Sequence, residues 1–199
     1  MNLEPEKTTT VTLGGATLGA GDHLCVFHRG QEERDQLLVP FFAEGLGAGD
    51  AVLFLGRDGG KETIPALLGE HDNLQVTEPE NGHLRNGRYS PDDLFVRLDD
   101  WVGRTLVSGA APFGRTAGDM SWASQLMSPT LLPELIGEEI AVTSWLREYP
   151  LVVLCLYDLE LFGGDLIIPM VKAHPKVWMA GTLVENPYYL RSAENGVRH

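Results

Sequence analysis

The segment LVVLCLYD, from Leu151 to Asp158, limits more than any other what this chain can fold into. Its apolar residues fall on both alternating faces, so as a strand it has to be covered on both sides. That pattern is typical of a strand at the centre of a parallel sheet. Two shorter apolar runs, HLCVF (His23 to Phe27) and AVLFL (Ala51 to Leu55), predict further buried strands.

Helical patterns alternate with these strands. The clearest is SPDDLFVRLDDWV, where Ser90 is a candidate N-cap, Pro91 suits the first helical position and apolar residues recur at helical spacing. Alternating strands and helices predict an α/β fold with a three-layer, doubly wound, mostly parallel sheet. We expect a single domain at residues 21–190, with residues 1–20 as a flexible polar lead-in and residues 191–199 as a C-terminal tail.

The charge and the ends of the chain restrict its partners. A formal net charge of −13 argues against direct binding to nucleic acid, which depends on Lys and Arg neutralising phosphates. The N-terminal residues lack the basic and apolar regions of a signal peptide, and no apolar run reaches the roughly 18 residues of a membrane span. The two cysteines do not indicate a secreted disulfide framework. We therefore expect a cytoplasmic protein that does not contact membranes.

The stretch GRDGGKET, which follows Leu55, raises the question of a phosphate-binding loop. A Walker A loop has the pattern G-x-x-x-x-G-K-[ST], because glycine amides cradle the phosphates and the hydroxyl contacts magnesium. Gly60 and Lys61 would require glycine at position 55 and Ser or Thr at position 62, where the chain has Leu55 and Glu62. We interpret the stretch as a strand-to-helix turn without a functional Walker A loop. A nucleotide-binding protein or ATPase stays an alternative, with Lys61 on phosphate and Asp119 or Asp158 on magnesium.

Two histidines and two cysteines near strand ends are the side chains that zinc prefers, namely His23, Cys25, Cys155 and His174. Strand alternation places His23 and Cys25 on one face, and Cys155 and Tyr157 on one face. No pair has C-x-x-C or H-x-x-x-H spacing, and buried cysteine often acts only as a small apolar residue. We therefore predict no metal and no other cofactor. A metal- or thiol-based redox sensor using Cys25 and Cys155 is a second alternative.

Further polar and aromatic residues gather where strands end or on the helix at about residues 129–148. The helix carries Glu138 and Glu139 among apolar neighbours, so we expect one carboxylate to point inward, where it needs a partner. The strand-end residues are Tyr157, Asp158, Asp119, Met120 and Trp122. The chain has neither G-x-S-x-G nor G-x-G-x-x-G after a strand, so no catalytic residue is predicted and the protein is not expected to be an enzyme. An apolar pocket with a polar rim suits binding of a small molecule.

Taken in order, these segments resemble the MEDS family, the sensory domain of DcmR-type regulators. The resemblance runs from Gly21 to Tyr189 through GDHLCVF, NGRYSPDDL, GDMSW, the helix with Glu139, YPLVVLCLYDLELFGG and HPKVWMAGTLVENPYY. Leu156 and Leu159 stand where more polar residues are usual in the family. The order and spacing of the segments carry the resemblance more than any single motif.

The resemblance implies a degenerate RecA-like domain that senses small hydrocarbon derivatives in signal transduction and transcription regulation. Members occur beside DNA-binding or histidine-kinase modules, and also alone. Since this chain shows neither module, we expect its signal to pass through a protein partner or through an oligomer of the chain. Carried over residue by residue, the implied ligand-binding positions are His23, Cys25, Asp119, Trp122, Glu139, Cys155, Tyr157, Asp158 and His174.

Overall fold

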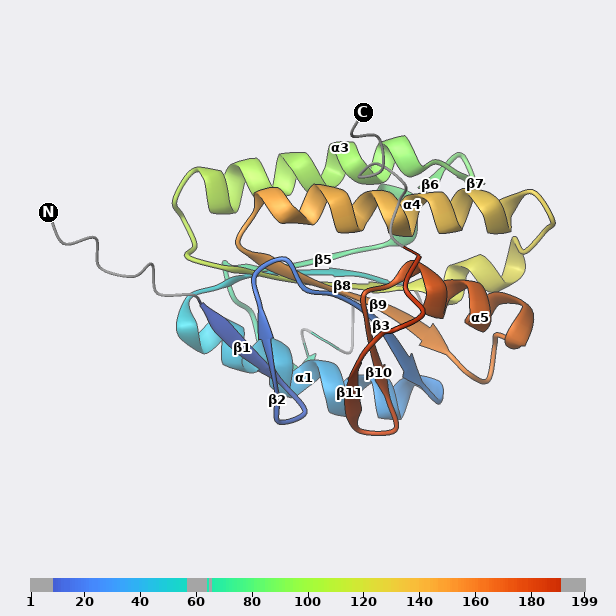
Figure 1. Ribbon diagram of the computed structural model, residues 1–199. Helices are drawn as coiled ribbons and strands as arrows, with labels where there is room; N and C mark the ends of the chain where they lie inside the picture. The colour runs from blue at the N-terminus through green and yellow to red at the C-terminus, as the bar shows by residue number, and fades with distance from the viewer. Residues whose placement is uncertain (1–8, 57–63, 65, 191–199) are drawn as a thin grey trace, which may run out of the picture.

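The computed structural model describes residues 9–56, 64 and 66–190 (Figure 1). The candidate phosphate loop at residues 57–63, the first eight residues of the lead-in and the tail at 191–199 lie outside the described residues.

A seven-stranded sheet forms the centre of the domain, in the order β11-β10-β3-β9-β8-β4-β5. Its neighbours are parallel from β10 to β5, and only β11 runs antiparallel at its edge. The strands are β3 (His23–His28), β4 (Ala51–Leu55), β5 (Leu74–Thr77), β8 (Gly114–Asp119), β9 (Leu151–Asp158), β10 (Lys176–Met179) and β11 (Thr182–Glu185). Two small antiparallel pairs lie outside it, β1 (Thr10–Leu13) with β2 (Ala16–Gly19), and β6 (Leu84–Arg85) with β7 (Arg88–Tyr89).

Helices cover both faces of this sheet, which gives three layers. In Figure 1, α3 and α4 lie together on one face and α1 lies on the other. The long helices are α1 (Gly30–Ala48), α3 (Pro91–Val102), α4 (Leu131–Trp145) and α5 (Gly164–Ala173). Short helical turns are η1 (Pro79–Asn81), the π-helical η2 (Gly103–Val107), η3 (Met120–Gln125) and η4 (Leu146–Glu148). The predicted three-layer α/β architecture is confirmed, and it is that of a RecA-like fold.

The apolar pattern of β9 explains its place. All eight residues of the strand are buried, with Cys155 and Tyr157 in the core cluster toward α3, α4 and α5 and Leu154 and Leu156 in the cluster toward α1. Both alternating faces therefore pack against helices, as expected for a strand inside a parallel sheet. Along α1, Pro40 lies within one continuous helix. No helix among the described residues is long and apolar enough to cross a membrane.

The prediction of a flexible lead-in at residues 1–20 is wrong for its second half. Residues Thr10 to Gly19 form the β1–β2 hairpin, in which Leu13 and Leu18 are fully buried. Gly14, in the turn, has a φ of +54°, and a Cβ there would lie 2.4 Å from the Trp178 ring. Only glycine fits here, because it adopts a positive φ readily and has no Cβ to collide with the Trp178 ring. The hairpin therefore packs against the sheet and is part of the domain.

Strands β3 and β9 form the switch point of the sheet. They are adjacent and parallel, yet the chain leaves β3 toward β4 on one side and leaves β9 toward β10 on the other. In open α/β sheets the carboxyl ends of such strands border the usual ligand crevice. Here only Arg29 lies between β3 and α1, so this connection is too short to hold the eight-residue phosphate loop. The GRDGGKET stretch follows β4 and not β3.

Candidate functional site

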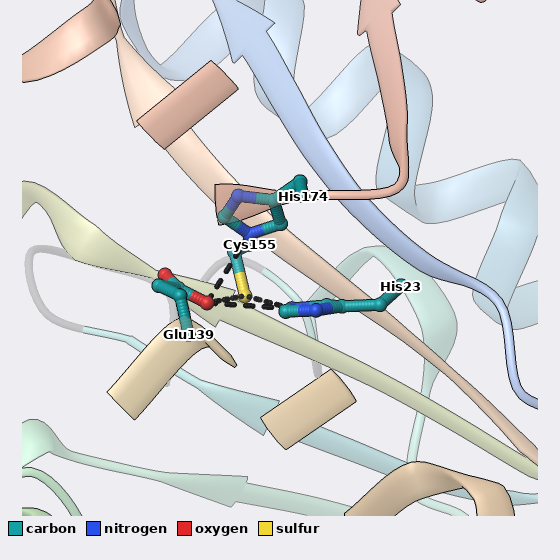
Figure 2. Close-up of side chains that lie close together, drawn as sticks. All are labelled: His23, Glu139, Cys155 and His174. Atoms are coloured by element: carbon teal, nitrogen blue, oxygen red, sulfur yellow. Dashed lines mark hydrogen bonds and ion pairs between the residues drawn. The ribbon is translucent and has the colours of Figure 1, made fainter. Parts of the chain in front are cut away.

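Four buried side chains converge between the sheet and helices α4 and α5 (Figure 2). His23 begins β3, Glu139 lies in α4, Cys155 is in β9, and His174 follows the last residue of α5. One nitrogen, oxygen or sulfur atom from each residue lies within 4.8 Å of all the others. We call these residues the four-residue cluster.

The cluster centres on one oxygen of Glu139. Its Oε2 lies 3.3 Å from Nε2 of His23, 3.1 Å from Nε2 of His174 and 3.2 Å from Sγ of Cys155. The Sγ of Cys155 also lies 3.2 Å from Nε2 of His23. All four side chains are buried, with exposed fractions between 0% and 7%.

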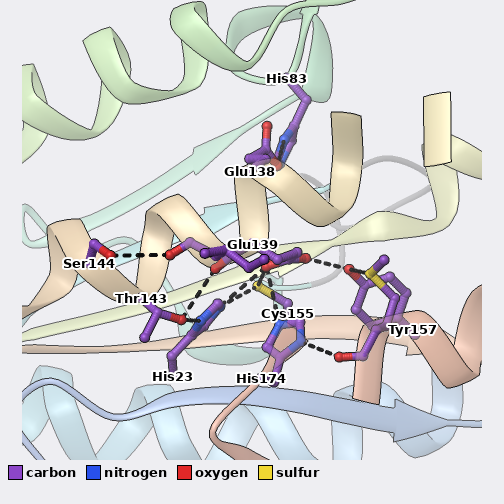
Figure 3. A network of polar contacts seen from close by, with 11 residues as sticks. His23, His83, Glu138, Glu139, Thr143, Ser144, Cys155, Tyr157 and His174 are labelled. Atoms are coloured by element: carbon purple, nitrogen blue, oxygen red, sulfur yellow. Dashed lines mark hydrogen bonds and ion pairs between the residues drawn. The ribbon is translucent and has the colours of Figure 1, made fainter. Parts of the chain in front are cut away.

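A second layer of hydrogen bonds orients three of these residues (Figure 3). The hydroxyl of Thr143 donates to the backbone carbonyl of Glu139, so its oxygen accepts from Nδ1–H of His23 at 2.7 Å. Nδ1 of His174 lies 2.7 Å from the carbonyl oxygen of Met170, which can only accept. The hydroxyl of Tyr157 donates to Oε1 of Glu139. Each side chain thereby turns one defined atom toward the centre.

Burial and neighbouring charge shift the pKa values in the cluster. Burial and the nearby His174 lower the pKa of His23 to about 4, although Glu139 partly opposes them. Burial would raise the pKa of Glu139, but the imidazoles of His174 and His23 outweigh it and hold that pKa well below its usual value. Burial and the charge of Glu139 raise the pKa of the Cys155 thiol well above its usual value. At neutral pH the cluster thus holds a neutral His23, a carboxylate and a thiol.

A small cavity of about 30 Å³ adjoins the cluster on the side of α3. Glu139 and Cys155 belong to its wall, and most other lining residues are apolar, among them Leu94, Leu98 and Val142. The polar lining groups are His83, Thr116 and Glu138. Since one buried water needs roughly 10 to 15 Å³ of such volume, the cavity has room for about two waters.

Several buried polar atoms of the cavity wall have no hydrogen-bond partner in the part of the chain that the structure describes. They are both ring nitrogens of His83, Oε2 of Glu138 and the hydroxyl of Thr116. Nδ1 of His83 lies 3.5 Å from Oε1 of Glu138, too far for a good hydrogen bond. A buried polar group without a partner costs about 1 to 3 kcal/mol, so these atoms suit hydrogen bonds with a molecule in the cavity.

An aromatic stack supports the same wall. The ring of Trp122 stacks on His83 with centroids 5.1 Å apart and on Tyr89 with centroids 5.7 Å apart. The indole nitrogen of Trp122 is buried and, among the described residues, unpartnered. Trp122 therefore borders the cavity region through His83 and does not belong to the four-residue cluster.

Asp119 and Asp158, two of the predicted ligand positions, lie apart from the cluster at the carboxyl edge of the sheet. Asp119 forms a 2.5 Å ion pair with Arg34 and accepts from the backbone and hydroxyl of Ser121. Asp158 accepts from the backbone amides of Gly30 and Glu160. Asp119 thus links the second turn of α1 to the chain after β8, and Asp158 links the first residue of α1 to the chain after β9.

The structure brings together His23, Glu139, Cys155 and His174 of the nine predicted positions and sets Tyr157 beside them. Cys25 pairs in register with Cys155 and is fully buried on the same side of the sheet, outside the cluster. Both cysteines are free thiols. One of Glu138 and Glu139 was predicted to point inward, and both are buried. His83 and Thr116 were missed, because a lone histidine in a loop and a threonine in a strand carry no motif.

Comparison with known proteins shows the family to which this chain belongs. Residues 22–175 match the model of the family described as MEDS, the "MEthanogen/methylotroph, DcmR Sensory domain", so the chain belongs to the MEDS family and carries its sensory domain. It is also similar to a transcriptional repressor, DcmR of Methylorubrum extorquens strain DM4, with 25% identity over 170 residues. That match covers 81% of this chain and 61% of the repressor, so the chain spans less than two thirds of the relative's length.

Proposed function

We propose that this sensory domain binds a small hydrocarbon derivative in the cavity beside α3 and α4, and signals occupancy through contact with a protein partner. One observation carries the proposal: an apolar cavity lined by buried polar atoms of His83, Thr116 and Glu138 that lack partners among the described residues. Apolar walls with a few converging polar groups are typical of small-molecule sites. Membership of the MEDS family supports a sensory role.

The size of the cavity suggests how binding would be signalled. At about 30 Å³ it is smaller than a compound of several heavy atoms, so such a ligand has to move part of the wall outward. Leu94 and Leu98 place α3 in that wall, and α3 is a surface helix whose Val96 is 69% exposed. A ligand shifts a conformational equilibrium only if it binds one state better than the other. If the ligand fits only the widened cavity, it favours the state in which α3 is displaced. A partner protein in contact with α3 would then distinguish the two states.

The proposal is tested by thermal unfolding of the full chain with a panel of one- to three-carbon alcohols, ketones and halogenated hydrocarbons. A ligand at about 100 times its Kd stabilises the folded state by about 2.7 kcal/mol, which raises Tm by about 5 to 10 °C for a chain of this size. Gly118→Ala provides the matched variant. Gly118 lines the cavity, and an added Cβ there meets its nearest neighbours at 3.8 Å, so the change fills space without strain.

We expect Gly118→Ala to lose the ligand-induced Tm shift while keeping its own Tm close to that of the natural chain. Gly137→Ala is the control, because its Cβ would meet nothing within 4 Å on the outer side of α4. It should respond to ligand as the natural chain does. A panel without any stabilising compound, or an equal shift in Gly118→Ala, would argue against this cavity as the sensing site.

A further inference from the structure

The hydrogen bonds around the four-residue cluster leave acceptor atoms facing one another. The hydroxyl of Thr143 accepts a hydrogen bond from Nδ1–H of His23, and the carbonyl of Met170 accepts one from Nδ1–H of His174. When both rings are neutral, these tautomers direct the lone pair of each Nε2 toward Oε2 of Glu139, at 3.3 and 3.1 Å. Lone pairs facing a carboxylate oxygen at such distances repel one another unless positive charge lies between them.

The dimensions of the cluster fit a four-coordinate metal ion. A tetrahedral site with metal–ligand distances of about 2.0 to 2.3 Å has neighbouring ligand atoms about 3.3 to 3.7 Å apart. The four contacts between cluster atoms range from 3.1 to 3.3 Å, and the remaining pairs lie within 4.8 Å. Only small side-chain adjustments would bring all four atoms to bonding distance from a common centre.

The chemical character of the four ligands points to the charge and type of the ion. With both histidines neutral, the thiolate of Cys155 and the carboxylate of Glu139 contribute two negative charges. A divalent ion therefore forms a complex without net charge, which avoids burying an unpaired charge among residues that are at most 7% exposed. Two imidazoles, one thiolate and one carboxylate are ligands that Zn²⁺ accepts in tetrahedral geometry.

We propose that His23, Glu139, Cys155 and His174 bind a divalent transition-metal ion, Zn²⁺ by preference, at the centre of this sensory domain. As the metal–sulfur bond forms, the Cys155 thiol releases its proton to the solvent. Thr143, Met170 and Tyr157 serve as the outer partners that fix the orientation of the ligands, as is usual around protein-bound metals.

The proposed metal lies next to the proposed ligand cavity, because Glu139 and Cys155 belong to both. The ion would hold α4, β3, β9 and the end of α5 together at the floor of the cavity. The metal proposal does not depend on the sensing proposal, since metal binding can be measured without any organic ligand.

The test begins with the full chain as purified, whose metal content is measured by inductively coupled plasma mass spectrometry. After treatment with a chelator, the protein is titrated with Co²⁺, followed by visible and near-ultraviolet absorption, and then with Zn²⁺. We expect one ion per chain, intense d–d bands of four-coordinate cobalt and a thiolate-to-cobalt charge-transfer band. Zn²⁺ should abolish both bands and raise the Tm of the chelated protein.

Variants assign the ligands. Cys155→Ser should lose the charge-transfer band and weaken Co²⁺ binding by about 100-fold or more, whereas Cys25→Ser should leave both unchanged, because Cys25 is a buried neighbour outside the cluster. Thr143→Val should keep the charge-transfer band but lower the affinity for Co²⁺ by about 10- to 100-fold. Thr143→Ser should bind Co²⁺ with the affinity of the natural chain, since serine keeps the hydroxyl that accepts from His23.

Several outcomes would overturn the metal proposal. One is a natural chain that binds no Co²⁺ or Zn²⁺ stoichiometrically and shows the same Tm with and without Zn²⁺, which would leave a proton between the histidines and Glu139 as the source of positive charge. Another is a cobalt spectrum without a thiolate band. A third is a Cys25→Ser variant that behaves as Cys155→Ser is expected to. The spectrum and Tm of the natural chain decide the matter even if a variant fails to fold.

Discussion

Tyr157→Phe tests how strongly the second layer of hydrogen bonds holds Glu139. The change removes only the hydroxyl that donates to Oε1 of Glu139 and lies 3.0 Å from Sδ of Met170, and it leaves the buried ring in place. Hydrogen bonds to charged groups contribute about 1.5 to 3 kcal/mol. Because Oε1 then becomes a buried carboxylate oxygen without a donor among the described residues, we expect the free energy of unfolding to fall by about that amount.

For a chain of about 200 residues this loss lowers Tm by about 3 to 12 °C. It is measured by urea and thermal unfolding in buffer with a chelator, so that metal binding does not contribute. Tyr188→Phe is the control, since Tyr188 is 73% exposed and should change stability little. In a double-mutant cycle with Glu139→Gln, the Tyr157–Glu139 coupling should reach about 1 kcal/mol or more. A coupling near zero, or equal effects of Tyr157→Phe and Tyr188→Phe, would refute the reasoning.

Lowering the pH from 6.5 toward 4 should destabilise the protein, because His23, whose pKa is lowered to about 4, stays neutral in the folded state while the unfolded chain takes up a proton. Urea unfolding across this range should show stability rising with pH by up to about 1.4 kcal/mol per unit, and His23→Asn should flatten that dependence. Gly45→Ala should cost about 1 to 3 kcal/mol, because its Cβ would lie 2.5 Å from Nε of Arg115, which Asp50 holds at 2.8 Å. Gly137→Ala, at an exposed position of α4, should instead raise the free energy of unfolding by about 0.5 to 1 kcal/mol. Equal effects of Gly45→Ala and Gly137→Ala in thermal unfolding would contradict these two predictions.

Local patterns were enough to predict the layers of the fold. The apolar run at Leu151–Asp158 and the periodic helix after Pro91 depend on neighbours within a few residues, so their structural meaning can be read directly. The β1–β2 hairpin escaped prediction because two strands of four residues carry little periodic signal. Its buried Leu13 and Leu18 gain their place from packing against the rest of the domain.

The four residues of the cluster were among the predicted positions, but their arrangement was not predicted. The family resemblance pointed to nine residues, and four of them converge on one point in the structure. Zinc ligation had no support from the spacing of His23, Cys155 and His174, because the ligands come from separate strands and helices. Cys25 lies on the same strand and face as His23, yet Glu139 and not Cys25 completes the cluster.

By itself the sequence determined the alternation of strands and helices, the central place of β9, and the acidic charge that disfavours nucleic acid, since each follows from residue types and local periodicity. Only the tertiary structure decided which side chains meet. Parallel pairing set Cys155 beside β3, and the packing of α4 and α5 on that face turned Glu139 and His174 toward it. Contacts between residues far apart along the chain depend on how the layers pack, which no short segment records.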